Sequence, residues 1–286
     1  MYLNTEENKK VWVEKVERIL RIGGRSYKTF VNYKVHIKRF LNYYDNDTDF
    51  CNIKEEDILD FIEINYLKLN RTSASTNVAI CSIKFLYSVC FKINLNRKLI
   101  PNIKMVQALP SLISKKDFIN IINNTDNLKH KCWLLLAFCS GLRSSEVVSV
   151  RIEDINAEEH KIKVLGKRKK ERYTVLPDIT IKFLRLYCKY NNITKKTGYL
   201  FVNNQGKPNS SATVTEMFMF IKQRYNIPDN ITFHSLRHSF ATYFLTNGGD
   251  LLALQALLGH KDLNTTRRYI HFSKNYNHLN GINYVE

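Results

Sequence analysis

Apolar residues recur at helical spacing along nearly the whole chain, and this pattern limits the possible folds more than any other feature. Between about Val11 and Arg97, apolar residues repeat at spacings of three and four in separate stretches, as they do on the buried face of a helix. Alternation with a period of two occurs only at 161–165 and 172–176, on either side of a Lys-rich turn, which is typical of a β-hairpin. Ser26 and Ser114 each precede such a stretch and are predicted helix caps, and the almost wholly apolar run at 131–140 predicts a central buried helix. We therefore predict a mainly α protein with one small antiparallel hairpin.

Two prolines mark a break between two domains. Helical periodicity lapses between Leu99 and Ser114, and Pro101 and Pro110 interrupt any helix there. A chain of 286 residues is long enough for two ordinary domains. We therefore predict a helical domain at 1–100, a linker at 101–113, and a second, α-rich domain at 114–286 that carries the hairpin.

The charge balance indicates a polyanionic partner. The formal net charge is +18 and the pI is about 9.6, and so many Lys and Arg residues repel one another unless an acidic molecule binds them. Nucleic acid is the first candidate for that molecule. A solvated basic surface without a partner is the alternative.

The sequence favours a soluble protein over a membrane-bound or secreted one. Its N-terminal residues are polar and charged, and we see no apolar run near the roughly 18 residues that a membrane span needs. Six cysteines, at positions 51, 81, 90, 132, 139 and 188, form no CxxC pair and lie in apolar helical patterns, which argues against metal binding or disulfides. We expect a cytoplasmic protein whose cysteines are core residues in a reducing compartment.

The stretch from His234 to His271 contains the strongest candidates for chemistry. His234 and Arg237 stand three residues apart, so on a helix they share a face and can converge on one small anion. A glycine ends a second predicted helix directly before His260, and a third helix carries Tyr269. A continuous helix would place His260 and Tyr269 on opposite faces, so the turn between them is what allows both to approach one point.

Six polar residues of the second half stand at predicted helix termini or turns or lie close to them. Paired arginines donate forked hydrogen bonds to phosphate oxygens, which Lys cannot reproduce. A Tyr hydroxyl with a pKa near 10 is a poor nucleophile at neutral pH, but a nearby cationic cluster stabilises both the phenolate and the charge that develops on phosphorus. Phosphodiester chemistry therefore suits this set: Arg143, Lys167, His234, Arg237, His260 and Tyr269.

Four segments of the second half resemble the tyrosine recombinase (phage integrase) family. They are GLRSSEVVSVRIEDI at 141–155, GKRKKER at 166–172, HSLRHSFAT at 234–242 and LLGHKDLNTTRRYIH at 257–271. One such segment alone is a weak signal, but all four occur in order, with the final Tyr nine residues after the second His. The helical first half is similar to that family's core-binding domain, so the resemblance covers most of the chain.

The resemblance implies a role for each of five residues. Arg143 and Arg237 match the two arginines that clamp the scissile phosphate. His234 matches the residue that accepts a proton near the nucleophile, and His260 the hydrogen-bond donor to a phosphate oxygen. Tyr269 matches the nucleophile, which forms a 3′-phosphotyrosyl link and frees a 5′-hydroxyl. His238 is left with a structural role.

Lys167 matches the general acid that protonates the leaving 5′-oxygen. Many relatives have Gly after this Lys, whereas this chain has Arg168, followed by Lys169 and Lys170. The position after Gly166 favours Lys167, and Lys169 and Lys170 are the alternatives.

The resemblance also implies how such a protein works. Strands are cut and rejoined without a nucleotide cofactor or a metal, since the covalent link keeps the energy of the broken bond. The implied partners are double-stranded DNA and three further copies of the chain, as a tetramer on two DNA sites, with no membrane and no small-molecule substrate. No extra module precedes the helical half, which is expected for a Xer-like or transposon-resolvase type. The alternatives are a type IB-like topoisomerase that relaxes DNA without exchanging partners, and a DNA-binding protein without catalysis.

Overall fold

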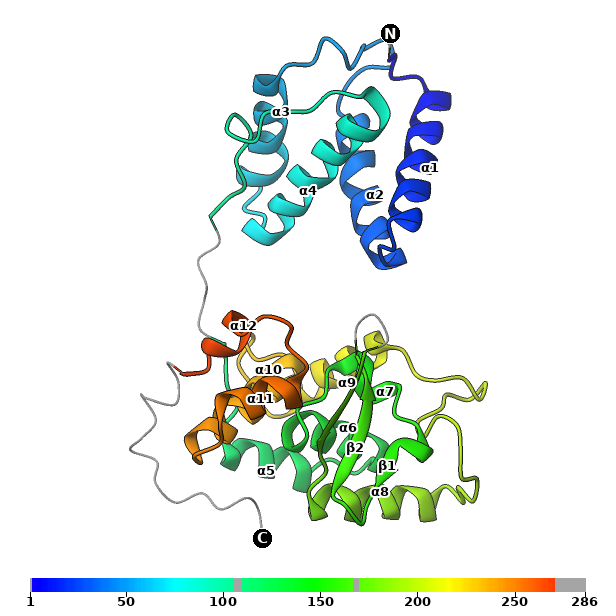
Figure 1. The fold of residues 1–286 in the computed structure, drawn as a ribbon, viewed down its shortest axis with the longest axis vertical. Helices are drawn as coiled ribbons and strands as arrows, with labels where there is room; N and C mark the ends of the chain where they lie inside the picture. The colour runs from blue at the N-terminus through cyan, green and yellow to red at the C-terminus, as the bar shows by residue number, and fades with distance from the viewer. Residues whose placement is uncertain (1, 105–109, 167–169, 271–286) are drawn as a thin grey trace. The chain divides into compact units, whose positions relative to one another are not determined.

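The computed structural model describes residues 2–104, 110–166 and 170–270 (Figure 1). The chain divides into two compact units, Met1–Gln107 and Ala108–Glu286. The described parts are mainly helical, with a single three-stranded sheet among them. The predicted fold class is therefore confirmed.

The first unit consists of helices packed around one aromatic core. Thr5, Ser26 and Thr72 each accept a hydrogen bond from a backbone amide three residues later, so hydroxyl groups cap three of the helices. Two helices continue into a π-helical turn. The elements are α1 (Glu6–Ile22), α2 (Tyr27–Leu41), α3 (Glu55–Ile62) with η1 (Glu63–Leu67), and α4 (Ser73–Leu86) with η2 (Tyr87–Phe91).

Phe50 stands at the centre of that aromatic core. Its ring stacks on Phe91 with centroids 5.4 Å apart and meets Phe40 and Trp12 at 5.7 and 5.6 Å. Such ring pairs add to the stabilisation that comes from burying apolar area.

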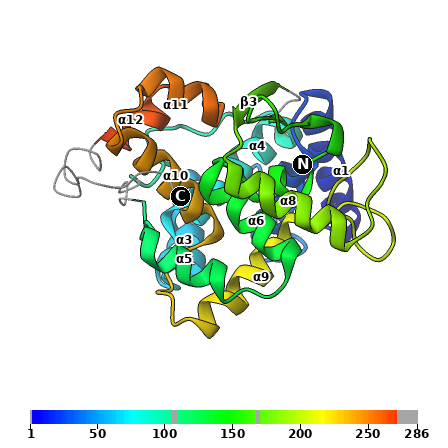
Figure 2. The ribbon, with the colours of Figure 1, turned by 90° about the horizontal axis from the view of Figure 1, so that it is seen from below.

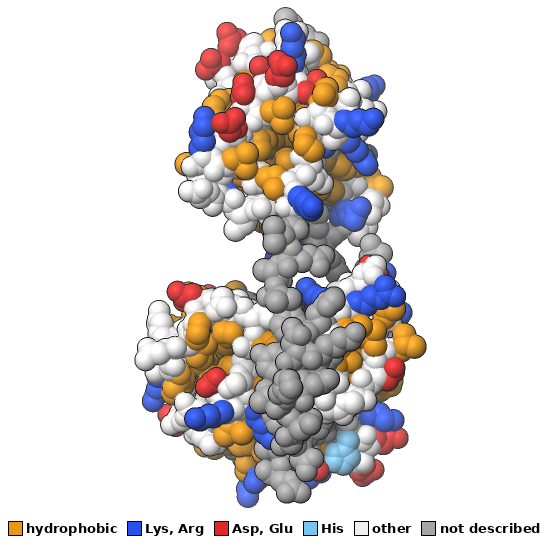
Figure 3. Space-filling model, turned by 90° about the vertical axis from the view of Figure 1, so that its left-hand side faces the viewer, with side chains coloured by type: hydrophobic (Ala, Val, Ile, Leu, Met, Phe, Trp, Pro, Cys, Tyr) orange, Lys and Arg blue, Asp and Glu red, His pale blue; other side chains and the backbone are white. Residues whose placement is uncertain are grey.

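On the face shown in Figure 3, apolar side chains also gather at the surface of this unit, with Asp and Glu towards one end and Lys and Arg along one side. The surface charge of this unit is therefore unevenly distributed.

One expectation about apolar runs needs correction. The helix Ser73–Phe91 is long and apolar enough, by length and composition, to cross a membrane. Half of it is buried inside the first unit, where Ala79, Ile83 and Leu86 contribute to the core. Its apolar composition is therefore accounted for by packing, as in the core helix of many soluble proteins.

The second unit has α6 (Leu128–Cys139) as its central buried helix. From Cys132 to Cys139 every residue of this helix is apolar and buried, and the helix packs between α8 (Asp178–Tyr190) and α10 (Phe233–Thr246) (Figure 2), as predicted for a central buried helix at 131–140. Ser114 caps α5, which the sequence also predicted. The remaining helices are α5 (Lys115–Asn123), α7 (Ser144–Val148), the 3-10 turn η3 (Ile152–Asp154), α8 (Asp178–Tyr190), α9 (Ser211–Arg224), α10 (Phe233–Thr246), α11 (Leu251–Leu258) and α12 (Asn264–Arg267).

The sheet of the second unit is antiparallel in the order β1-β2-β3. The predicted hairpin is present as β2 (Lys161–Leu165) and β3 (Glu171–Val175), with Val164 opposite Arg172. The sequence missed β1 (Ile155–Asn156) because two residues are too few to show a period of two. The hairpin turn at 167–169 lies outside the described residues.

Candidate active site

Gly141 builds one wall of the site by ending α6 in a conformation that favours glycine. Its φ of +68° lies in the left-handed region, and a Cβ atom there would come within 2.5 Å of the Phe240 ring. The backbone therefore passes close to α10. Its carbonyl oxygen accepts a hydrogen bond of 2.5 Å from Nη1 of Arg237, so this glycine fixes a guanidinium of the site.

Arg237 is the most deeply buried charged residue of the site. Its exposed fraction is 1%, and its Nη2 donates to the carbonyl of Leu258 at 2.6 Å and lies 3.3 Å from Nε2 of His260. Burial, and then the charge of Arg143, lower the pKa of Arg237 to about 9. The group remains protonated at neutral pH. Its orientation is fixed by the ends of α6 and α11 before any ligand binds.

Glu146, in the first turn of α7, accepts hydrogen bonds from two arginines and lies close to a third. Arg143 donates from its backbone amide at 2.8 Å and from Nη1 at 2.7 Å. Arg172 donates from both terminal nitrogens at 2.8 Å, and Nη1 of Arg237 lies 3.6 Å away. Burial raises the pKa of Glu146, but the hydrogen bonds and charge of Arg172, with the amide of Arg143, outweigh it and lower the pKa to about 2. The carboxylate is therefore ionised at neutral pH.

Arg172 is a residue of this site that was not predicted from the sequence. It stands on β3, its side chain is 9% exposed, and its Nε donates to the carbonyl of Leu257 at 2.8 Å. A Cβ on Gly259 would come within 2.8 Å of its Cδ, so the end of α11 has to be glycine for the two segments to approach. Arg172 therefore joins the hairpin, α7 and the end of α11. The sequence showed Arg172 as the last residue of the GKRKKER segment, but it did not show that Glu146 is its buried partner.

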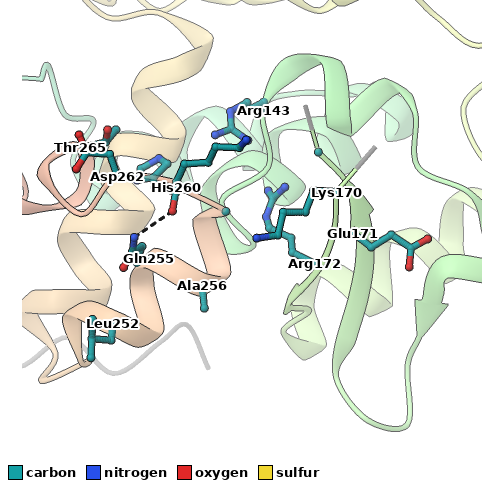
Figure 4. A pocket seen from close by; sticks show the side chains of 13 residues that line it. Arg143, Lys170, Glu171, Arg172, Leu252, Gln255, Ala256, His260, Asp262 and Thr265 are labelled. Carbon is teal, nitrogen blue, oxygen red and sulfur yellow. Dashed lines mark hydrogen bonds between the residues drawn. The ribbon is translucent and has the colours of Figure 1, made fainter. Parts of the chain in front are cut away.

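His260 follows α11 and is held by both of its ring nitrogens. Nε2 lies 3.3 Å from Arg237, and Nδ1 lies 2.9 Å from the hydroxyl of Thr266. Its backbone amide donates to the carbonyl of Gln255, whose side chain donates back to the carbonyl of His260 (Figure 4). Burial, and then the charges of Arg237 and Arg143, lower the pKa of His260 to about 3. The ring is therefore neutral at physiological pH.

Tyr269 lies beyond α12 and is buried, with an exposed fraction of 1%. Its hydroxyl is 2.7 Å from Nδ1 of His238, and its ring belongs to a small apolar cluster with Phe240 and Leu258. Burial raises the pKa of Tyr269, although the charges of Arg268 and Arg237 oppose the rise. The phenol is therefore protonated and covered in this structure.

Two histidines on one face of α10 link Tyr269 to the arginines. The rings of His234 and His238 meet edge to face with centroids 4.6 Å apart. Part of the His234 ring is exposed, yet burial of the rest and the charge of Arg237 lower its pKa to about 4. His238 was predicted to have a structural role, and its contact with the phenol was not predicted. Its spacing of four residues from His234 was the one available signal.

An open pocket of about 740 Å³ adjoins Arg143, Arg172 and His260. Arg143, Lys170 and Arg172 reach it from one side, and His260 and Gln255 come from the other (Figure 4). The structure thus brings Arg143, Arg237 and His260 together, with His234 and Tyr269 beside them through His238. Lys167 lies outside the described residues.

Comparison with known proteins identifies the family. The family model described as "Phage integrase family" matches residues 113–276, and one described as "Phage integrase, N-terminal SAM-like domain" matches residues 12–97. The chain belongs to the phage integrase family. This tyrosine recombinase is 31% identical to tyrosine recombinase XerD of Staphylococcus saprophyticus over 273 residues, which cover 88% of this chain and 90% of that protein. The predicted family is confirmed.

Further relatives and solved structures are similar to this recombinase. XerD of Staphylococcus haemolyticus is 35% identical over 187 residues, 62% of this chain and 63% of that protein. The fold matches the XerH recombinase bound to a palindromic difH substrate in a post-cleavage complex, with a TM-score of 0.75, 22% identity, and coverage of 92% and 82%. It also matches a lambda integrase dimer bound to a COC′ core site, with a TM-score of 0.73, 19% identity, and coverage of 90% and 96%.

Proposed function

We propose that this recombinase cuts and rejoins DNA at specific sites through a covalent link between Tyr269 and a DNA 3′-phosphate. In this reaction the phenolic oxygen of Tyr269 forms a bond to phosphorus, and the bond from phosphorus to the 5′-oxygen breaks. Reversal with a 5′-hydroxyl from another strand rejoins the DNA. No bond energy is lost, so the cycle needs no nucleotide cofactor, and the proposal contains no step at a metal.

The single observation that carries the proposal is the surplus of positive charge around one carboxylate. Arg143, Arg172 and Arg237 surround Glu146, and three guanidinium charges against one carboxylate leave a local charge of +2. A phosphodiester carries one negative charge and approaches two in a pentacovalent transition state. Fixed cations at a partly desolvated site stabilise the developing charge more than the ground state. The cluster therefore suits the transition state of phosphoryl transfer.

Each remaining residue has a proposed part in moving a proton or holding the phosphate. Arg143 and Arg237 clamp the nonbridging oxygens, and His260 donates a hydrogen bond to one of them. His234 accepts the proton of Tyr269, and Lys167 donates a proton to the leaving 5′-oxygen. Lys169 and Lys170 are the alternatives for that acid. The position of His234 beside His238, which contacts the phenol, supports a proton path along this face of α10.

The proposed partners are double-stranded DNA and further copies of this chain. A net charge of +18 supports a DNA partner. One structural neighbour is a lambda integrase tetramer bound to a Holliday junction, and we propose a tetramer on two DNA sites here, acting in the cytoplasm. The core DNA-binding domain is proposed at 1–100 and the catalytic domain at 114–286. The ranges 12–97 and 113–276 that the family models match support this division.

Replacement of the nucleophile tests the proposal. A nicked duplex that carries the recombination site, first located by footprinting on DNA flanking the gene, should trap a covalent adduct with wild-type protein. Tyr269→Phe should bind the same duplex and form no adduct. Tyr190→Phe is the matched control, because Tyr190 is 78% exposed and lies on α8. Adduct formation by Tyr269→Phe, or no adduct with wild type, would contradict the proposal.

The general acid has a separate test. Lys167→Ala should slow cleavage of an ordinary phosphodiester strongly, since a poor leaving group departs without its proton. A 5′-bridging phosphorothiolate, whose thiolate leaves without a proton, should restore the rate. Lack of restoration would move the role to Lys169 or Lys170.

A further inference from the structure

Thr266 contacts both the phosphate-binding histidine and the turn that carries the nucleophile. It is fully buried in α12, and its hydroxyl lies 2.9 Å from Nδ1 of His260. Its backbone carbonyl accepts a hydrogen bond of 3.0 Å from the amide of Tyr269. The neighbouring Thr265 is exposed. Thr266 is therefore the threonine of this pair whose hydroxyl contacts His260.

The contacts of His260 fix which ring nitrogen carries the proton in this structure. A guanidinium has donors and no acceptor, so Arg237 Nη2, at 3.3 Å, has to donate to Nε2 of His260. The ring is neutral, in line with a pKa lowered to about 3 by burial and by Arg237. Its single proton is therefore on Nδ1, and Nδ1 donates to the hydroxyl oxygen of Thr266. The assignment rests on the geometry of two hydrogen bonds.

A phosphate in the site requires the opposite arrangement. Phosphate oxygens accept hydrogen bonds and donate none. The lone pair of an unprotonated Nε2 would therefore point at a lone pair of the phosphate oxygen, and the two atoms would repel each other. His260 can donate to the phosphate only with its proton on Nε2, and then Nδ1 has to accept. A threonine hydroxyl can accept in the first arrangement and donate in the second. A buried group able to do only one of these would oppose one of the two states.

We propose that Thr266 is a positioning residue that supports both tautomers of His260, so that the ring can accept from Arg237 in the free protein and donate to the scissile phosphate in the complex. The part of this proposal that concerns donation to the scissile phosphate rests on the proposed function. The exchange moves one proton from Nδ1 to Nε2 through solvent, with no net uptake or release. Arg237, released from Nε2, is then able to direct Nη2 to the same phosphate.

The free protein tests the first half without DNA. Nitrogen-15 NMR of the full chain, labelled at histidine and assigned with His260→Gln, distinguishes the tautomers by the chemical shifts of the two ring nitrogens. We expect the Nδ1–H form in wild type and in Thr266→Ser. Thr266→Val, which keeps the shape and loses the hydroxyl, should keep that form, because Arg237 still donates to Nε2, but its Nδ1 resonance should shift because the hydrogen bond to the hydroxyl is lost. An Nε2–H ring or an imidazolium in the free wild-type protein would overturn the proposal.

The DNA complex tests the second half. Tyr269→Phe bound to the uncleaved site should show the Nε2–H form, and persistence of the Nδ1–H form would overturn the proposal. In single-turnover cleavage at saturating DNA, Thr266→Val should be roughly five- to tenfold slower, the value of about one hydrogen bond. Its affinity for DNA should not change. Thr266→Ser, which keeps the hydroxyl, should cleave at close to the wild-type rate.

Two outcomes of the cleavage assay separate this proposal from the proposed function. Equal rates for Thr266→Val and wild type, or equal slowing in Thr266→Ser and Thr266→Val, would overturn the role of the hydroxyl and leave the function intact. Absence of any adduct with wild type would contradict the function instead. The tautomer of His260 in the free protein would then still decide whether Thr266 and His260 are paired as described.

Discussion

Replacement of Arg172 by Met should destabilise the second unit more than any change to its exposed ion pairs. Arg172 donates two hydrogen bonds to Glu146 and one to the carbonyl of Leu257, with a side chain that is 9% exposed. Met fills a similar volume, so packing is largely kept and the charge is lost. Breaking a buried pair by removing one partner costs about 3–5 kcal/mol, because the other charge stays buried without compensation.

Tryptophan fluorescence can measure the stability of the second unit separately from that of the first. The chain has two tryptophans, with Trp12 in the core of the first unit and Trp133 in that of the second. In a Trp12→Phe background, urea unfolding therefore reports the second unit alone. We expect Arg172→Met to lower its free energy of unfolding by about 3–5 kcal/mol with an unchanged m-value, and to lower its Tm by roughly 6–20 °C.

Arg151 provides the matched control for this measurement. It forms an ion pair of 2.6 Å with Glu153, but its side chain is 45% exposed. Solvent screens exposed pairs, which contribute little to stability, so Arg151→Met should cost much less than Arg172→Met. If Arg172→Met costs as little as Arg151→Met, the claim that Glu146 depends on Arg172 for its charge is refuted.

Two further predictions concern Glu146 and the buried phenol. The pKa of Glu146 is lowered from 4.5 to about 2 in the folded state, so its contribution of roughly 3 kcal/mol is present above pH 4.5 and is lost as pH falls towards 2. When the free energy of unfolding is measured with urea at several pH values, Glu146→Gln should lack this loss of stability at low pH. An unchanged pH dependence would contradict the lowered pKa of Glu146. His238→Ala removes the hydrogen-bond partner of Tyr269 at 2.7 Å, so nitration of Tyr269 by tetranitromethane in the DNA-free protein should speed up several-fold. His238→Asn, whose amide lies near the position of Nδ1, should react more slowly than His238→Ala, and equal rates for the two variants would argue against the hydrogen bond.

Local patterns in the sequence were sufficient to predict several of the helices. Ser26 and Ser114 each precede an amphipathic stretch, and each caps a helix in the structure. The apolar run at 131–140 forms the buried helix α6. These features depend on neighbours within a few residues, so periodicity and capping predicted them. The two-residue strand β1 was too short to leave such a pattern.

Contacts between distant residues were not predictable in the same way. Arg172 looked like one more basic residue near the hairpin turn, and its partner Glu146 stands 26 positions earlier. The hydrogen bond from Tyr269 to His238 spans 31 positions. Spacing placed Tyr269 near the site, but it gave no sign that the phenol is buried. Only tertiary packing decides which of several similar side chains lies next to a given charge.

The central claim is that the phenol of Tyr269 attacks phosphorus, and the adduct itself tests this most directly. The covalent complex trapped on a nicked site can be digested with nuclease and protease, and the modified peptide sequenced by mass spectrometry. We predict a nucleotide on Tyr269. A nucleotide on Tyr276, on Tyr284 or on any other residue would contradict the claim.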